Sequence, residues 1–237
     1  MNLADIPKEK LSPMMQQYAA TKEKYNDCIL FFRLGDFYEM FFEDAILVSR
    51  ELELTLTGKE CGLEERAPMC GVPYHSVELY LKRLVDKGYK IAICEQMTDP
   101  ALSKLVERDV IRIVTPGTLI ESSMLDDDSN NYICTLYYGN DGSCALCFAD
   151  LSTGEMSLTI PQEASDLSVR IMDVLSRYMP AELVMNSQAL SLKSVMDFIK
   201  VRLQCAVSLR DDICFDRYRT GNWSASSSAF PLWICWA

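Results

Sequence analysis

Residues Phe31-Phe32-Arg33-Leu34-Gly35-Asp36-Phe37-Tyr38-Glu39-Met40-Phe41-Phe42 decide how the first half of the chain folds. The run from Cys28 to Leu34 is apolar and of strand length, and Gly35 interrupts it. Asp36 is a predicted helix N-cap, because Glu39 stands three residues later in the capping-box position. The spacing of the apolar residues that follow predicts a helix to about Glu51. The stretch therefore predicts a strand, a tight turn and a helix.

Phe37 falls at the first position of this predicted helix, where a large ring has little helix beneath it to pack against. Two interpretations follow. The ring folds back into the core, as most aromatic side chains do, or it projects from the turn. The residues by themselves leave both open.

Gly35-Asp36-Phe37-Tyr38-Glu39 resembles the mismatch-reading motif of the bacterial MutS DNA mismatch-repair family. Four further segments resemble motifs of that family in the same order, namely Ser12–Tyr18, Pro68–His75, Ala92–Gln96 and Arg112–Thr118. The resemblance is strong over residues 12–118 and continues more weakly to about residue 216. It implies a mismatch-recognition domain over residues 1–118, a linker over 119–131 and a connector domain over 132–237.

The residue pattern predicts an α/β protein in which a small mixed sheet with flanking helices is followed by a second unit. In the first unit we expect a helix from Ser12 to about Tyr25, a strand over Leu54–Thr57, a surface loop over Gly58–Arg66, an irregular segment over Pro68–His75, a helix after Ser76, and strands over Lys90–Glu95 and within Val106–Val114.

The polar, acidic segment Glu121–Asn131 is typical of a linker, and a different pattern follows it. Three antiparallel strands are expected over Tyr132–Tyr138, Ser143–Asp150 and Glu155–Ile160, then a helix (Ser165–Tyr178), a strand (Glu182–Met185), a helix (Ser187–Val201) and a strand (Leu203–Leu209). This order resembles a ribonuclease H-like fold, which is also the fold of the family's connector domain. The serine-rich segment Ser224–Ser228 and the apolar end Phe230–Ala237 depart from the family pattern, so we expect this domain to be incomplete.

The resemblance implies that Phe37 wedges into the minor groove and stacks on a mispaired base, while Glu39 forms a hydrogen bond with that base. Such a wedge unstacks a base step, which costs less at a mispair because that site is already poorly stacked. Gly35, Asp36 and Tyr38 complete the motif and are expected at the same DNA interface. In its contact with the base, Glu39 either accepts a hydrogen bond from the base, or is itself protonated and donates one to a base acceptor. Glu39 also has an alternative role, the capping-box bond to the Asp36 backbone.

Charge gives little support for DNA binding over a broad surface. The net charge is −11, and neither half of the chain is net positive. Any DNA contact must therefore be local, or be helped by a part of the protein outside this chain. Lys59 is a candidate phosphate contact, or else a solvated lysine in a loop.

Two other classes of function compete with mismatch binding. Ribonuclease H-like folds often carry metal-binding carboxylates, and Asp150 and Glu155 flank a turn, which leaves a nuclease as an alternative. The acidic second half also fits a protein-interaction fragment. The resemblance implies a MutL-type repair partner that binds the connector domain, and a homodimer that depends largely on domains outside this chain.

The resemblance also implies that the full-length family protein is an ATPase that uses ATP and magnesium, but this chain has no G-x-x-x-x-G-K-[ST] phosphate loop. We therefore expect no catalytic residues and no cofactor in this chain. The 10 cysteines are scattered, and His75 is the only histidine, so buried free thiols are expected and no metal site. Without a signal peptide or a long apolar run, the protein is expected to be cytoplasmic and not membrane-bound.

Overall fold

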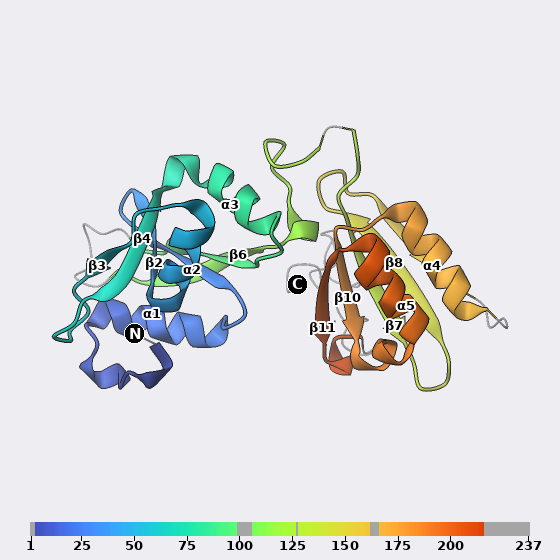
Figure 1. The fold of residues 1–237 in the computed structure, drawn as a ribbon, viewed down its shortest axis with the longest axis horizontal. Helices are drawn as coiled ribbons and strands as arrows, with labels where there is room; N and C mark the ends of the chain where they lie inside the picture. The colour runs from blue at the N-terminus through green and yellow to red at the C-terminus, as the bar shows by residue number, and fades with distance from the viewer. Residues whose placement is uncertain (1–2, 99–105, 127, 162–165, 216–237) are drawn as a thin grey trace. The chain divides into compact units, whose positions relative to one another are not determined.

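The computed structural model describes residues 3–98, 106–126, 128–161 and 166–215 (Figure 1). The chain divides into two units, Met1–Val114 and Thr115–Ala237, and each contains one mixed sheet with helices packed on it. The predicted α/β class is therefore confirmed. The expectations for Ser224–Ser228 and Phe230–Ala237 lie outside the described residues.

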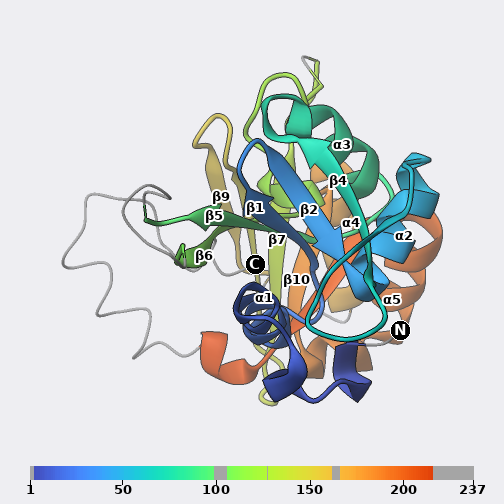
Figure 2. The same cartoon turned by 90° about the vertical axis from the view of Figure 1, so that its left-hand side faces the viewer.

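The first unit is built on a six-stranded sheet with the order β3-β4-β2-β1-β5-β6. Its strands are β1 (Ile29–Leu34), β2 (Phe37–Phe41), β3 (Thr57–Lys59), β4 (Ala67–Pro73), β5 (Ile91–Gln96) and β6 (Arg108–Val114). Strands β1 and β5 are parallel, and all other neighbours are antiparallel. The two central strands, β1 and β2, form a hairpin that places the chain reversal at one end of the sheet (Figure 2).

Helices cover both faces of this sheet. On one face, Tyr18 of α1 (Pro13–Lys24) is buried with its ring edge-on to Phe32 and Phe41, at centroid distances of 5.4 and 5.0 Å. On the other face lies α2 (Phe42–Leu52), where the Ala45 carbonyl accepts a bond from Cys70 Sγ of β4. Helix α3 (Val77–Val85) follows β4 and contacts α2. The predicted helix from Ser12 is confirmed, and so is the helix after Ser76.

The deciding stretch folds differently from the sequence prediction. Residues Phe37–Phe41 form strand β2, and helix α2 begins only at Phe42, without a side-chain cap. Asp36 is therefore a turn residue and not an N-cap, and Glu39 lies within a strand and not in a capping box. The reason is period 2: Tyr38 and Met40 face one side of the sheet, and Phe41 faces the other. Because both faces of β2 carry buried aromatic or apolar side chains, its sequence lacks the alternation of apolar and polar residues by which a strand is usually recognised.

Three other predictions for the elements need correction. The short strand lies at Thr57–Lys59 and not at Leu54–Thr57. The segment expected to be irregular after Pro68 is strand β4, whose prolines lie near its ends. The single helix expected over Ser187–Val201 is a 3-10 turn (Ser187–Ser191), helix α5 (Lys193–Phe198) and a π turn (Ile199–Leu203).

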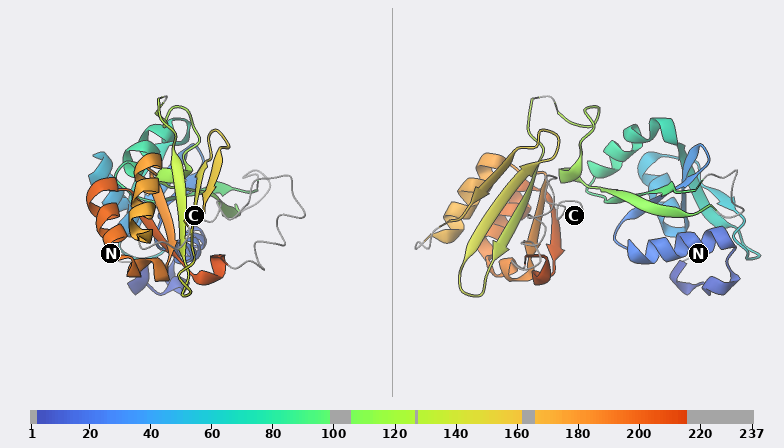
Figure 3. Two further views of the ribbon diagram at one scale, coloured as in Figure 1. Left: turned by 90° about the vertical axis from the view of Figure 1, so that its right-hand side faces the viewer. Right: turned by 180° about the vertical axis from the view of Figure 1, so that it is seen from behind.

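The second unit has a five-stranded sheet with the order β11-β10-β7-β8-β9. Its strands are β7 (Tyr132–Tyr138), β8 (Cys144–Asp150), β9 (Met156–Thr159), β10 (Glu182–Asn186) and β11 (Ala206–Arg210). Helices α4 (Leu167–Tyr178) and α5 pack on one face and bury a core around Phe148, Ile171 and Leu183. Figure 3 shows the strands in front of these helices in its right-hand view. The three antiparallel strands and the parallel strands β10 and β11 match the predicted order.

Short 3-10 turns connect the remaining elements, at Leu3–Asp5, Lys8–Lys10, Tyr74–Ser76, Pro116–Thr118 and Asp212–Phe215. In the described part of the chain, none of the helices combines the length and the apolar character needed to cross a membrane.

Candidate nucleic-acid interface

The turn between β1 and β2 has two residues, Gly35 and Asp36. Leu34 and Phe37 are opposite each other in the ladder that flanks it. Gly35 has φ 58°, and Asp36 is not among the positive-φ residues, which is the pattern of a type II′ hairpin turn with glycine first. A Cβ on Gly35 would meet no atom within 4 Å, so backbone conformation and not space requires glycine here.

Phe37 is the first residue of β2 and is 46% exposed, while the other four phenylalanines of the first unit are buried. Its neighbours across the ladders are Leu34 on one side and Pro73 on the other. The exposed fraction of the side chains decreases along this face of β2. The Glu39 side chain is only 16% exposed, and Phe41 is fully buried under Tyr18 of α1. Phe37 is therefore an apolar ring at the open end of a packed face, not a core residue.

Glu39 forms an ion pair with Lys59 of β3, with 2.5 Å between Lys59 Nζ and Glu39 Oε2. The ammonium lies 5.7 Å from the centre of the Phe41 ring, and the Lys59 side chain is 32% exposed. Glu39 is opposite Gly71 of β4, where a Cβ would be 3.4 Å from Glu39 Cγ. Lys59 is thus not a free loop lysine: it belongs to a strand and neutralises the carboxylate two residues from Phe37.

Tyr38 points to the opposite face of the sheet and is buried. Its hydroxyl donates to Glu95 Oε1 of β5. Burial, and secondly this bond to a carboxylate, raise the pKa of Tyr38 to about 12. Tyr38 is therefore placed to support the turn from behind and not to touch a ligand beside Phe37.

Sequence reasoning did not single out Arg33, Tyr74 or Glu95, although all three contact the motif. Arg33 Nε donates to the Gly35 carbonyl at 2.5 Å, and Arg33 Nη1 is 3.4 Å from Glu95 Oε1. Tyr74 donates its backbone N–H to the Asp36 carbonyl at 2.9 Å. Tyr74 and Glu95 lie within two of the motifs quoted above, so motif order could have drawn attention to them, but not to their contact with the turn.

In the second unit, the Asp150 carboxylate accepts hydrogen bonds within the turn between β8 and β9. Its Oδ1 accepts bonds from the backbone N–H and the hydroxyl of Ser152 at 2.8 and 2.6 Å, and its Oδ2 accepts one from the Asn131 N–H at 3.1 Å. Glu155 Oε2 accepts from Asn130 Nδ2 at 3.0 Å. Among the described residues, no three His, Cys, Asp or Glu side chains are grouped to hold a metal ion. The Asp150 carboxylate therefore holds the turn, and the Glu155 carboxylate is bonded to Asn130 before β7.

The cysteines within the described ranges are free thiols, and most are buried. Cys144 and Cys147, the C-x-x-C pair, lie on strand β8, and only Cys144 joins the core under the helices. Burial raises the pKa of the Cys144 thiol to about 11, so it is protonated at neutral pH.

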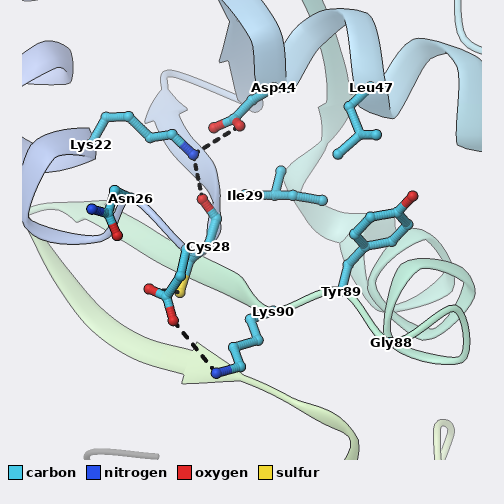
Figure 4. A pocket seen from close by; sticks show the side chains of 10 residues that line it. Lys22, Asn26, Cys28, Ile29, Asp44, Leu47, Gly88, Tyr89 and Lys90 are labelled. Carbon is cyan, nitrogen blue, oxygen red and sulfur yellow. Dashed lines mark hydrogen bonds and ion pairs between the residues drawn. The ribbon is translucent and has the colours of Figure 1, made fainter. Parts of the chain in front are cut away.

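A cavity of about 280 Å³ lies near the start of β1, at the end remote from Phe37 (Figure 4). Lys22 Nζ sits between Asp44 Oδ1, at 2.9 Å, and the Cys28 carbonyl, and Lys90 pairs with Asp27. Burial raises the pKa of Asp44, and the Lys22 charge opposes that shift. Because the cavity lies at the start of β1 and Phe37 is opposite the last residue of β1, the cavity is separate from the candidate interface. Its two lysines are paired within the fold.

The sequence was also compared with models of protein families and with known proteins. Residues 12–123 match the family model "MutS domain I", and residues 131–223 match "MutS domain II". The "DNA mismatch repair protein MutS" of Acetivibrio thermocellus is 52% identical over 208 residues, which are 87% of this chain and 24% of that protein.

The proteins of the same name from Clostridium tetani and Clostridium kluyveri give similar results. The first is 52% identical over 210 residues, covering 88% of this chain and 23% of its own length. The second is 56% identical over 177 residues, covering 73% and 20%. The chain thus spans about a quarter or less of the length of these relatives, and it belongs to the MutS family of DNA mismatch-repair proteins.

Proposed function

We propose that the first unit binds mismatched double-stranded DNA from the minor groove, with Phe37 as the wedge and Glu39 as the base contact. The observation that carries this proposal is the exposed Phe37 ring directly after a two-residue turn, at the end of a face that is otherwise packed. An apolar ring in this position can enter a base step with little rearrangement of the fold.

Discrimination in this proposal comes from the DNA. Insertion of an apolar side chain unstacks a base step and kinks the duplex, at a cost of a few kcal/mol. A mispair lowers that cost because its stacking is already weak, whereas a matched step bears the full cost. A single wedge can therefore serve many different mispairs without reading each base.

The Glu39–Lys59 pair supports the second part of the proposal. A lone carboxylate in a DNA groove is repelled by phosphates, but Lys59 cancels that charge while one Glu39 oxygen stays available to accept from a base. In this arrangement Glu39 has its own counter-ion within the fold. Lys59 then acts first on Glu39, and any phosphate contact is secondary.

The test is a titration of the purified 237-residue chain with labelled duplexes that differ only in one central pair, matched or mispaired, at one fixed salt concentration. The proposal predicts tighter binding of the mispaired duplex. Equal affinities for the two duplexes at several salt concentrations would overturn it.

A further inference from the structure

Four residues form a connected group beside the Gly35–Asp36 turn, on the face of the sheet opposite Glu39. They are Arg33 of β1, Tyr38 of β2, Glu95 of β5 and Tyr74, which follows β4. We call this group the Arg33 brace. Tyr38 is opposite Arg33 in the β1–β2 ladder, so both side chains lie on the same face of the sheet.

Arg33 occupies the centre of the group. Its Nε donates to the Gly35 carbonyl, its Nη1 faces Glu95, and its guanidinium lies 3.8 Å from the centre of the Tyr74 ring. The plane of an arginine can stack on an aromatic ring while its edge donates hydrogen bonds, which a lysine cannot do. The Arg33 side chain is only 16% exposed, so it is directed into the protein.

Both carbonyls of the turn are held in this way. Gly35 is held by the Arg33 guanidinium, and Asp36 by the backbone N–H of Tyr74, whose ring packs on the same guanidinium. The turn is therefore held from β1, through the Arg33 side chain, and from the segment that follows β4, through the Tyr74 backbone. A two-residue turn without such bonds would be free to bend away when a base step resists insertion.

We infer that Arg33 is a positioning residue for mismatch recognition, which acts on DNA only through the placement of Phe37. This inference rests on the proposed function. A wedge that is already fixed loses little conformational entropy when it enters the DNA. The smaller entropy loss makes the free energy of binding more favourable. This gain applies only to complexes in which Phe37 is inserted into the DNA, so it should favour mispaired over matched duplex.

The test is a double-mutant cycle on the full chain. Arg33→Met removes the guanidinium and keeps an unbranched side chain, and Phe37→Ala removes the wedge. We expect Arg33→Met to weaken binding of mispaired duplex by roughly 2- to 10-fold, the range for one side chain that must be ordered on binding. In the Phe37→Ala background the same change should alter affinity by less than about twofold.

Arg50→Met on α2 is the matched control, because it removes an equal charge from an exposed position. It should leave the mismatch preference unchanged. Faster hydrogen exchange of the Tyr74 amide in Arg33→Met, with unchanged exchange of core amides, would place the effect at the turn. If the Met variant melts below the assay temperature, Arg33→Lys takes its place in both backgrounds, and we expect a smaller loss of the same kind.

Equal losses from Arg33→Met with and without Phe37 would show a direct DNA contact and overturn the inference. So would no loss in the parent background. A Phe37→Ala chain that keeps the full mismatch preference would overturn the proposed function itself, and the inference with it. Loss of preference in Phe37→Ala, but not in Arg33→Met, would refute the brace alone.

Discussion

At the scale of single residues, the Glu39–Lys59 pair determines how a carboxylate can face DNA. Lys59→Met should weaken binding of mispaired duplex, because an ionised Glu39 then meets the phosphates without its partner. In a Glu39→Gln background the same change should cost less, since no charge remains to be neutralised. We expect a coupling energy of about 0.5–3 kcal/mol, the usual range for side chains in contact, measured by titration of the four variants.

Lys8 provides the control for this cycle. It forms an ion pair of similar length with Glu23, at 2.6 Å, but both side chains are exposed and outside the candidate interface. Lys8→Met should leave the mismatch preference as it is. If Lys59→Met costs the same in the parent and in the Glu39→Gln background, Lys59 contacts phosphate directly and the counter-ion role is wrong.

Asp150 gives a residue-scale prediction about pH. Burial by itself raises the pKa of this carboxyl, but hydrogen bonds from Ser152, Asn131 and Thr153 outweigh it and hold the pKa below its usual value. A folded-state pKa below the unfolded one contributes stability above the unfolded pKa, about 3.9. That stability is lost as pH falls through the folded pKa.

Asp150→Asn should therefore lower the stability of the second unit at pH 7 by about 1–3 kcal/mol, since four donors lose a charged acceptor. It should also flatten the loss of stability below about pH 4. Asp173→Asn, on the helix α4 of the same unit, is the control for removing one charge. Denaturant melts from pH 7 to pH 3 measure both effects. An unchanged pH dependence in Asp150→Asn would contradict the assignment.

At the scale of elements, the β1–β2 turn depends on the backbone of Gly35. Gly35→Ala should destabilise the chain by about 1–2 kcal/mol, because an L-residue at φ 58° is strained even though space is free. Asp36→Ala, at the neighbouring position without a positive φ, should cost clearly less. Equal melting temperatures for the parent and Gly35→Ala would show that the turn does not need this conformation.

The same turn shows what sequence patterns can and cannot predict. Phe37, Met40 and Phe41 have helical spacing, and Asp36 with Glu39 imitates a capping box, so local patterns favour a helix. The strand forms instead because it buries Tyr38 and Met40 on the face of the sheet that carries α2, while Phe41 packs under Tyr18 of α1 on the other face. A strand with helices on both faces gives no polar alternation, and only the neighbouring strands fix its identity.

The second unit is easier to predict. The limits of Tyr132–Tyr138 agree with β7, and Ser143–Asp150 differs from β8 by one residue. Here the turn residues Gly139 to Gly142 mark the hairpin locally, and no long-range contact is needed to recognise it. Arg33, in contrast, gains its role from residues up to 62 positions away, such as Glu95, which no local pattern reports.

At the scale of the whole molecule, we expect the chain to bind mismatched DNA without the ATP binding and hydrolysis that the family resemblance implies for the full-length protein. The absence of a G-x-x-x-x-G-K-[ST] segment from these 237 residues predicts that the purified chain neither binds nor hydrolyses ATP. Equilibrium dialysis with labelled ATP and magnesium measures this directly. Saturable binding at micromolar ATP would contradict the prediction.

The net charge of −11 also has a consequence for the whole chain. Without a net positive charge to attract a duplex over a broad surface, binding of matched duplex should be weak. The preference for mispaired DNA must then come from the few residues at the turn. Phe37 is therefore the residue whose removal should change binding of mispaired DNA most.

The most direct measurement is therefore made on Phe37→Ala, with Leu79→Ala as the control because Leu79 is another exposed apolar residue, 71% exposed on α3. Both variants are melted and titrated with mispaired and matched duplex. The account predicts a melting temperature close to that of the parent and a loss of about 1–3 kcal/mol for mispaired DNA only. It predicts no such loss for Leu79→Ala. A stability loss of roughly 3–5 kcal/mol, as for a core phenylalanine, with an unchanged mismatch preference would contradict it.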